Sequence, residues 1–450
     1  MVRCHVLVNA GHAIANTENH DTSATAQRLF EWLIAPMSVE TFYKDYFEKE
    51  PFVIRRQAKH YYSGWFGKAD VDALLKDRSA DIRYTRDIDI TSYKDGKRVT
   101  LNPPPKTRGE GDTASVDHPR ATADQVWEFF KRGCSVRFLC PQRYSPKVWR
   151  LLNLLDEFFG CMAGANTYLT PASTQGFAPH YDDVDIFVMQ TEGAKRWRLY
   201  PPRHTGEILD QYSSRNFGPD EIPKQPILDV WLSAGDFLYA PRGVIHQVTG
   251  TEEGREGGGP DEDSMHVTVS TALLNSWRIF LSKMFEIATD NAFLESMDIR
   301  KCLPRNYFSY MGVSHSDLEG DERREAFMAK TTQLVQQLVD NLPANGITVA
   351  PQVALRIQGG SWPGRFSQAQ EKMAQLITVD TRVKLISRDI FRVVNDNERK
   401  GDTVLLYHYM KNSRVSGENP LSFLKVGVEF TTALDDLNDH YPNYVRVGDL

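Results

Sequence analysis

The sequence has few of the patterns that mark secreted, membrane-spanning or zinc-binding proteins. Its five cysteines are scattered without a CxxC pair, which argues against a zinc ribbon or a disulfide framework and suits a reducing compartment. No stretch reaches the roughly 18 apolar residues of a membrane span, and residues 1–20 do not have the pattern of a signal peptide. No basic cluster of the nuclear-localisation type stands out either.

The composition that remains is ordinary for a soluble globular protein. The chain has 450 residues, of which 41% are hydrophobic and 25% charged, so we expect two to four structural units. A net charge of −6 gives no overall attraction to nucleic acid, although it leaves a local basic patch open.

Periodicity divides the chain into parts of different character. Residues 1–25 are polar, and we expect them to be flexible. The next part mixes helices and strands. It includes a hairpin around Asp95–Gly96 and an amphipathic helix capped by Ser145 and ended by Gly160. Residues 103–124 are rich in Pro, Gly, Asp and Thr and predict a surface loop.

Residues 164–275 consist of short apolar or alternating runs separated by turns, which predicts a β-sandwich, jelly roll or small barrel. We expect the stretch 252–264 to be a turn inside this unit. Residues 276–345 form long helices. Their buried candidates are Phe280, Met284, Ile287, Leu334, Val335 and Leu338. From 346 to 450 strand and helix patterns mix, with 13 basic and 12 acidic residues.

A His-x-Asp motif at His180 and Asp182 precedes an apolar strand. In an extended segment these two side chains share one face and can grip one metal ion together. His246, in GDFLYAPRGVIHQV, is the candidate third ligand. Two imidazoles and one carboxylate form the facial triad of non-haem Fe(II) oxygenases.

By itself a His-x-Asp pair is more often a surface or capping pair than a metal site. Lys195 opens the following strand, and alone it reads as a solvated strand lysine. Inside a barrel, a lysine is costly unless it meets an anion, such as the distal carboxylate of a keto-diacid bound to the metal. The triad and the lysine together favour the oxygenase interpretation.

The sequence around these residues resembles that of the JmjC-domain ribosomal oxygenases. The resemblance rests on AQRLFEWLIAP, GANTYLTPASTQGFAPHYDDVDIFVMQTEGAKRWRLY, GDFLYAPRGVIHQ, HVTVSTALLNSW, NYFSYMGVSHSD and YPNYVRVGDL, and it covers nearly all of residues 26–450. Within this family the chain is most similar to the nucleolar branch of bifunctional lysine demethylases and histidyl-hydroxylases.

The resemblance implies an α+β fold with a double-stranded β-helix (a cupin-like jelly roll) that holds Fe(II) and 2-oxoglutarate and uses O₂. It implies that His180, Asp182 and His246 are iron ligands and that Lys195 binds the far carboxylate of 2-oxoglutarate. Asn166, Tyr168 and Thr268 would line the pocket for the co-substrate or substrate, although each could equally be a satisfied polar residue of a strand. His266 would lie next to the ligands rather than bind the metal itself.

The family also implies an organisation into a flexible 1–25, a JmjC oxygenase domain at 26–275 with its core barrel at about 164–275, a helical dimerisation domain at 276–345 and a winged-helix-like domain at 346–450. The family pattern continues beyond RVGDL, so we expect the last domain to be incomplete at its C-terminus. The near-neutral charge of that domain argues against direct binding of nucleic acid.

The implied reaction is hydroxylation of a histidine side chain in a large-subunit ribosomal protein. Two alternatives stay open: a histone H3 lysine demethylase that regulates chromatin and transcription with the same cofactors, and an inactive JmjC scaffold. The family implies a homodimer and a place in the nucleus and nucleolus. We expect no association with membranes.

Overall fold

The structure is a computed structural model. It describes residues 11, 14, 21–108, 115–249, 262–273, 275–315, 320–340, 342, 377–385, 387, 390–395, 403–408, 414–415 and 422–450. Most of the stretch 1–20, most of the turn expected at 252–264 and the first part of 346–450 lie outside these residues.

The N-terminal part begins with a buried helix, α3 (Thr22–Ile34), followed by α4 (Val39–Thr41) and the helical turn η1 (Phe42–Tyr46). The carboxylate of Asp21 caps α3 by accepting a hydrogen bond from the Ala24 amide at 3.0 Å. The helix starts inside the stretch expected to be flexible, because Thr22 and Thr25 are already buried in its first turn.

The local signals in the next segment are confirmed. Strands β2 (Ile88–Lys94) and β3 (Lys97–Thr100) form the expected hairpin. Its turn residues Asp95 and Gly96 have φ angles of 52° and 74°, as a two-residue type I′ turn requires. The segment 103–124, expected as a loop, contains the short antiparallel pair β4 (Lys106–Arg108) and β5 (Ser115–Asp117).

Helix α7 also ends where the sequence predicts. It spans Pro146–Phe159, Ser145 Oγ accepts from the Val148 amide at 3.3 Å, and Gly160 closes the helix at φ 67°. The preceding elements are α5 (Lys68–Lys76), α6 (Ala123–Lys131) and β6 (Ser135–Leu139).

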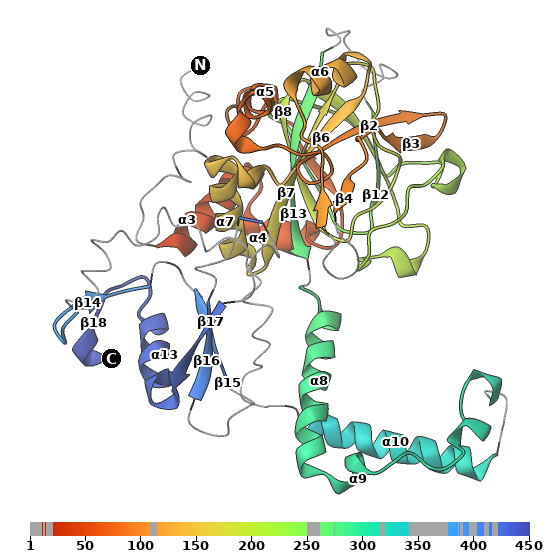
Figure 1. Cartoon of the computed structure of the whole chain (residues 1–450), viewed down its shortest axis with the longest axis vertical. Coiled ribbons are helices and arrows are strands. Elements are labelled where there is room, and N and C mark those ends of the chain that lie inside the picture. The colour runs from red at the N-terminus through yellow and green to blue at the C-terminus, as the bar shows by residue number, and fades with distance from the viewer. Residues whose placement is uncertain are drawn as a thin grey trace.

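Two antiparallel sheets build the unit that holds the site (Figure 1). The larger sheet has the strand order β1–β11–β8–β13–β7–β6–β2–β3, and the smaller has the order β10–β9–β12. The bounds not yet given are β1 (Phe52–Ile54), β7 (Met162–Thr170), β8 (Asp185–Glu192), β9 (Ala194–Tyr200), β10 (Leu228–Ser233), β11 (Phe237–Ala240), β12 (Ile245–Thr249) and β13 (Ser264–Leu273). The α+β jelly-roll class implied by the family resemblance is confirmed.

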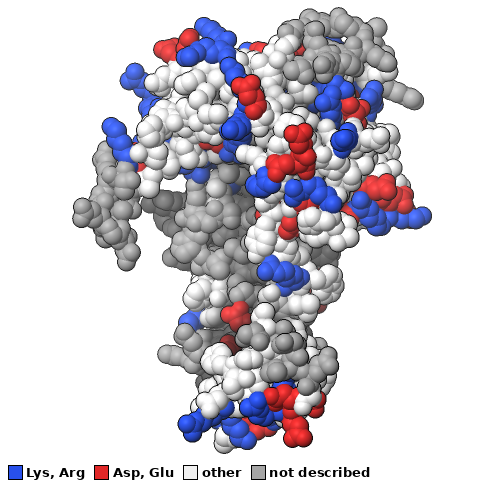
Figure 2. Space-filling view, turned by 90° about the vertical axis from the view of Figure 1, so that its right-hand side faces the viewer, with Lys and Arg blue, Asp and Glu red and all other residues white. Residues whose placement is uncertain are grey.

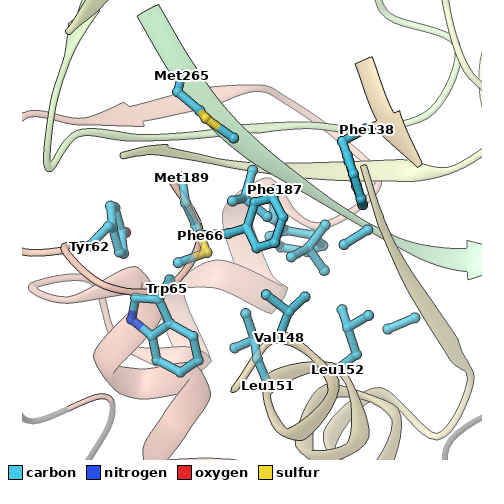
Figure 3. Packing of buried hydrophobic residues seen from close by; sticks show 14 of the residues in the cluster. Tyr62, Trp65, Phe66, Phe138, Val148, Leu151, Leu152, Phe187, Met189 and Met265 are labelled. Atoms are coloured by element: carbon cyan, nitrogen blue, oxygen red, sulfur yellow. The ribbon is translucent and has the colours of Figure 1, made fainter. Parts of the chain in front are cut away.

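The central strand β8 of the larger sheet is buried on both faces. On its outer face, Phe187 and Met189 of β8 pack with Leu151 and Leu152 of α7 and with Met265 of β13 (Figure 3). The alternate β8 residues Ile186 and Val188 point the other way, where they pack with Trp197 and Leu199 of β9. This two-sided burial explains why β8 reads as an almost continuous apolar run.

Helices α8 (Trp277–Glu295), α9 (Met297–Arg300) and α10 (Glu322–Asp340) extend away from the sheets (Figure 1). Of the six side chains expected to be buried here, Met284 is buried, Val335 is 46% exposed and the other four are half-buried. The expectation is wrong for Val335, because none of the described residues covers its side chain enough to bury it. None of the described helices is both long and apolar enough to cross a lipid bilayer.

The C-terminal part contains a three-stranded sheet of β15 (Phe391–Asn395), β16 (Thr403–His408) and β17 (Ser422–Gly427), then helix α13 (Thr431–Asp439). Strands β14 (Arg382–Val383) and β18 (Val445–Arg446) form a second small sheet. This part contacts the start of the chain, since the Tyr441 hydroxyl accepts from the Thr22 amide at 2.6 Å.

Phe187 offers a test of the outer core. It is fully buried, and its ring lies within 6.1 Å of the rings of Phe30, Phe42, Phe159 and Tyr239, measured between centroids. Replacing Phe187 with Ala should lower the free energy of unfolding by about 3–5 kcal/mol, because apolar burial is lost and a cavity remains. Urea denaturation followed by tryptophan fluorescence measures the change.

The control is Val99→Ala at an exposed position of β3, where the same measurement should change by less than about 0.5 kcal/mol. Equal losses in the two variants would contradict the assignment of Phe187 to the outer core.

Candidate functional site

Three of the predicted site residues converge at one end of the two sheets. One ligand atom each from His180, Asp182 and His246 lies within 4.8 Å of the others. Asp182 faces both imidazoles, with its carboxylate oxygens 3.9 Å from His180 Nε2 and 3.8 Å from His246 Nε2. Among the described residues, this is the one group of three or more such side chains close enough to hold a metal ion.

A backbone bridge brings the two histidines together. The His246 amide donates to the His180 carbonyl at 2.8 Å, and the His180 amide donates to the His246 carbonyl at 3.2 Å. The bridge joins the segment before β8 to strand β12 of the other sheet, and it places the two ring centroids 4.4 Å apart.

Both rings are held by their Nδ1 atoms. His180 Nδ1 lies 2.8 Å from the Ala178 carbonyl oxygen, and His246 Nδ1 lies 3.4 Å from that of Val244. A carbonyl oxygen can only accept, so Nδ1 carries the hydrogen and Nε2 keeps its lone pair. Both Nε2 lone pairs are therefore available to a metal. In metal sites generally, a hydrogen bond from the other ring nitrogen orients the histidine in this way.

Burial keeps His246 neutral. Burial, together with the neighbouring His180, lowers the pKa of the His246 imidazole to about 4. A neutral imidazole is the form that binds a metal.

The turn before β12 fixes the position of His246. Gly243 has a φ of 85°, and a Cβ at this position would overlap the Glu207 carbonyl oxygen, so a glycine is needed here. Its amide donates to the Asp182 carbonyl at 3.1 Å, and the Arg242 amide donates to Asp185 at 2.9 Å. The turn is thus hydrogen-bonded to the segment that carries Asp182.

Lys195 lies between the two sheets, as the sequence predicts. It is 3% exposed, and its ammonium donates to Thr170 Oγ1 at 2.6 Å. No carboxylate of the described residues forms an ion pair with it, and burial lowers its pKa to about 7. A buried cation without an anion is costly, so the position is suited to a ligand carboxylate.

Asn166, Tyr168 and Thr268 lie on the inner face of the larger sheet. Asn166 pairs with Thr268, and Tyr168 pairs with His266, across strands β7 and β13. Directly opposite residues of a sheet point to the same face, so these side chains share the face toward Lys195 and the histidines. Their predicted role in lining the pocket stays a prediction.

His266 is the most confined of these side chains. Its ring stacks on Tyr168 at 5.0 Å and meets the edge of Trp197 at 5.3 Å. Burial and the charge of Lys195 hold its pKa well below the usual value, so the ring is neutral. Its buried Nδ1 has no hydrogen-bond partner among the residues that the structure describes, although buried polar atoms are normally paired.

Sequence reasoning missed two residues that support the site. Thr170 holds the Lys195 ammonium, and Arg137 of β6 pairs with Asp89 and lies beside the Tyr168 phenol. In the sequence, both residues lie within segments predicted as strands. Their roles depend on which residues face each other across strands, for which the sequence carried no signal.

The donors present fit an iron ion and a dicarboxylate. Two imidazole nitrogens and a carboxylate oxygen make the ligand set of a facial triad. The buried Lys195 ammonium, which forms no ion pair with a described carboxylate, is a charged group nearby that a bound anion would satisfy.

Known protein families agree with this geometry. The family model described as JmjC domain matches residues 137–276. The model described as ribosomal oxygenase 1, C-terminal winged helix domain, matches residues 359–450.

Curated relatives span nearly the whole chain. Ribosomal oxygenase 1 of Gallus gallus is 39% identical over 445 residues, which cover 96% of this chain and 69% of the relative. The bifunctional lysine-specific demethylase and histidyl-hydroxylase NO66 of Dictyostelium discoideum is 38% identical over 440 residues, which cover 96% of this chain and 79% of the relative.

Among solved structures, the Escherichia coli ribosomal oxygenase YcfD in complex with cobalt and 2-oxoglutarate is 16% identical, with a TM-score of 0.46 and 89% of each chain covered. The identity to the curated relatives over almost the full length is decisive: the chain belongs to the JmjC-domain ribosomal oxygenase family.

Proposed function

We propose that this chain is an Fe(II)- and 2-oxoglutarate-dependent oxygenase that hydroxylates a histidine side chain of a large-subunit ribosomal protein. The observation that carries the proposal is the convergence of His180, Asp182 and His246 beside the buried ammonium of Lys195. The names ribosomal oxygenase and histidyl-hydroxylase of its relatives support the substrate class.

In this proposal, His180, Asp182 and His246 hold the iron through two Nε2 atoms and one carboxylate oxygen. Three ligands on one face leave positions for a co-substrate and O₂. When bound, iron and 2-oxoglutarate supply the oxidant for C–H hydroxylation, with succinate and CO₂ as products. The chain orients the ligand atoms, because the carbonyl oxygens of Ala178 and Val244 hold the two rings by Nδ1 and turn Nε2 toward the metal position.

Lys195 binds the far carboxylate of 2-oxoglutarate, with the Thr170 hydroxyl positioning its ammonium. An ammonium and a carboxylate in a site without water attract each other more strongly than in solvent. Asn166, Tyr168 and Thr268 form the polar lining of the pocket, where they contact the co-substrate or the substrate.

Demethylation of histone H3 lysines is a second candidate for the same site. The name of the Dictyostelium relative includes lysine-specific demethylase, which is the observation that favours it. The chemistry needs no further residue, because a hydroxylated N-methyl group releases formaldehyde by itself. The two candidates differ in the atom placed beside the iron.

We also propose that the chain forms a homodimer through α8, α9 and α10. Large apolar side chains of this region are exposed, which is unusual for a stable monomer surface. The set comprises Trp277, Leu281, Phe293, Leu294, Met297, Leu303, Phe308, Val313, Met328, Val335 and Val339. A second copy of these helices would cover them.

Ribosomal protein is the partner that this proposal favours, and histone H3 is the alternative. Figure 2 shows Lys and Arg interspersed with Asp and Glu over the described part of one face, without a broad surface of one sign. This distribution and the net charge of −6 do not favour nucleic acid as a direct partner. A ribosomal-protein substrate supports a place in the nucleus and nucleolus, where ribosomes are assembled.

The activity is tested by incubating the protein with Fe(II), 2-oxoglutarate and peptides of ribosomal proteins or methylated histone H3. A mass gain of one oxygen on histidine is the expected result. Loss of methyl groups with release of formaldehyde, without histidine oxidation, would establish the second candidate instead. His180→Ala should abolish turnover, because one of three iron ligands is lost.

The matched control is His60→Ala, which removes an exposed histidine remote in sequence from the ligands and should leave turnover unchanged. Turnover that survives His180→Ala would refute the ligand assignment.

Lys195 should make the KM for 2-oxoglutarate depend on pH. Its pKa of about 7 without ligand means that the ammonium is charged below this pH and increasingly neutral above it. KM should therefore be flat below about pH 7 and rise by about tenfold per pH unit well above it. Steady-state kinetics between pH 6 and 9 measures the profile.

Two variants check this assignment. Lys195→Ala should raise KM by about 100-fold, as expected for removal of one partner of a buried charge pair. Lys195→Arg stays charged and should lose the rise in KM above pH 7. An unchanged pH profile in Lys195→Arg would show that another group titrates.

The dimer is tested by light scattering on a sizing column, where the expected mass is twice 51.2 kDa. Leu294→Glu combined with Met297→Glu places charges on the exposed apolar helices and should shift the mass toward one chain. Ile208→Glu, at an exposed position between β9 and β10, is the matched control and should stay dimeric. A wild-type mass of one chain would refute the homodimer.

A further inference from the structure

The loop between β7 and His180 lies directly on the inner face of the larger sheet. Gly176 is buried there, and a Cβ at this position would overlap the Ser135 side chain. The Tyr93 amide donates to the Gln175 carbonyl at 3.2 Å, and Gln175 Nε2 donates to the Phe177 carbonyl at 2.7 Å. These contacts fix the backbone of residues 175–177 and thereby the position of the Phe177 ring.

Phe177 belongs to a row of rings that leads away from the metal ligands. The His266 ring stacks on Tyr168, and the Tyr168 ring meets Phe177 at 5.2 Å between centroids. The guanidinium of Arg98 then lies 4.3 Å from the centre of the Phe177 ring. The row therefore runs from the iron site to β3, the edge strand of the larger sheet.

Arg98 is the member of this row whose charge is not neutralised. It is half-buried, its Nε is buried without a hydrogen-bond partner, and no carboxylate of the described residues forms an ion pair with it. Arg137, by contrast, pairs with Asp89. Burial and the charge of Arg137 lower the pKa of Arg98, so the surroundings disfavour its charge until an anion arrives.

We propose that Arg98 and Phe177 form a substrate subsite for one Asp or Glu side chain that flanks the oxidised residue. The Arg98 Nε is buried, but a carboxylate can accept two parallel hydrogen bonds from the Nη1 and Nη2 edge of one guanidinium, a bidentate geometry that suits arginine. The Phe177 ring covers one face of the guanidinium and keeps water from it, which strengthens the contact. This inference rests on the proposed function, because it assumes a peptide substrate.

A single carboxylate fits this position better than a polyanion such as RNA. One guanidinium can bind the two oxygens of one carboxylate. The chain as a whole carries a charge of −6, which does not attract a polyanion. A phosphate backbone would need several such cations side by side. In contrast, Arg137 next to Arg98 is already bound to Asp89.

The test uses a histidine-containing peptide and variants of it with Asp placed at each position from five residues before to five after the histidine. Affinity is measured by fluorescence anisotropy with Mn(II) and 2-oxoglutarate present and oxygen excluded, so binding is read without turnover. At one or two positions, Asp should tighten binding by about 10- to 100-fold over Ala. In aerobic assays with Fe(II), KM should fall accordingly while kcat stays similar.

Arg98→Gln should remove the preference for Asp, and its matched control Lys97→Gln should keep it, because Lys97 is exposed on the other face of β3. Arg98→Glu should reverse the preference, so that Lys at the same position now binds more tightly than Asp. Succinate formation without peptide and the melting temperature should stay unchanged in these variants, which shows that the metal site is intact.

The inference is overturned if Asp is preferred at no position, or if the preference survives Arg98→Gln. It is also overturned if Arg98→Gln weakens all peptides equally, since that result indicates a structural role. Preferred binding of RNA oligonucleotides through Arg98 would likewise contradict it. If peptides with Asp bind more tightly through Arg98 but no peptide is oxidised, the proposed function is refuted and the subsite stays in place.

Discussion

The pair of backbone hydrogen bonds between His180 and His246 is the contact on which the site depends. It ties the segment before β8, a strand of the larger sheet, to β12 of the smaller one. Because both partners are extended, their rings project to the same side, and Asp182 comes to lie against both. A slip of one residue on either side would turn a ligand away from the metal position.

The larger sheet supports this arrangement by keeping its two faces chemically distinct. The outer face carries aromatic and aliphatic side chains such as Phe187, which pack against α3 and α7. The inner face carries a polar row across five strands, formed by Asp89, Arg137, Tyr168, His266 and Gln190. Most of this row is internally paired. Among the described residues, the groups near the site that stay unsatisfied include the Lys195 charge, His266 Nδ1, Gln190 Oε1 and the charge of Arg98. The charges of Lys195 and Arg98 are places where a bound anion would complete the network.

Much of the fold could be predicted because its signals are local. The caps of α7 at Ser145 and Gly160 and the Asp95–Gly96 turn depend only on neighbouring residues, and the structure confirms them. The convergence of the candidate metal ligands could be predicted in part, because His180 and Asp182 are two residues apart in an extended segment. The exposed Val335 was predicted as buried because an apolar helix stripe does not say whether its partner belongs to the same chain or to another.

The sequence by itself determined the type of most elements, a β-rich central unit, the three ligand candidates and the lysine, because periodicity, turn chemistry and ligand type depend on short stretches. The jelly-roll class came from the family resemblance, and the β4–β5 pair was not predicted. Only the tertiary structure decided which residues meet across strands. Thr170 under Lys195, Arg137 beside Tyr168 and Arg98 over Phe177 each join side chains from different strands or loops. Such contacts follow from register and sheet packing, which are fixed by burial of the whole sheet rather than by any local pattern.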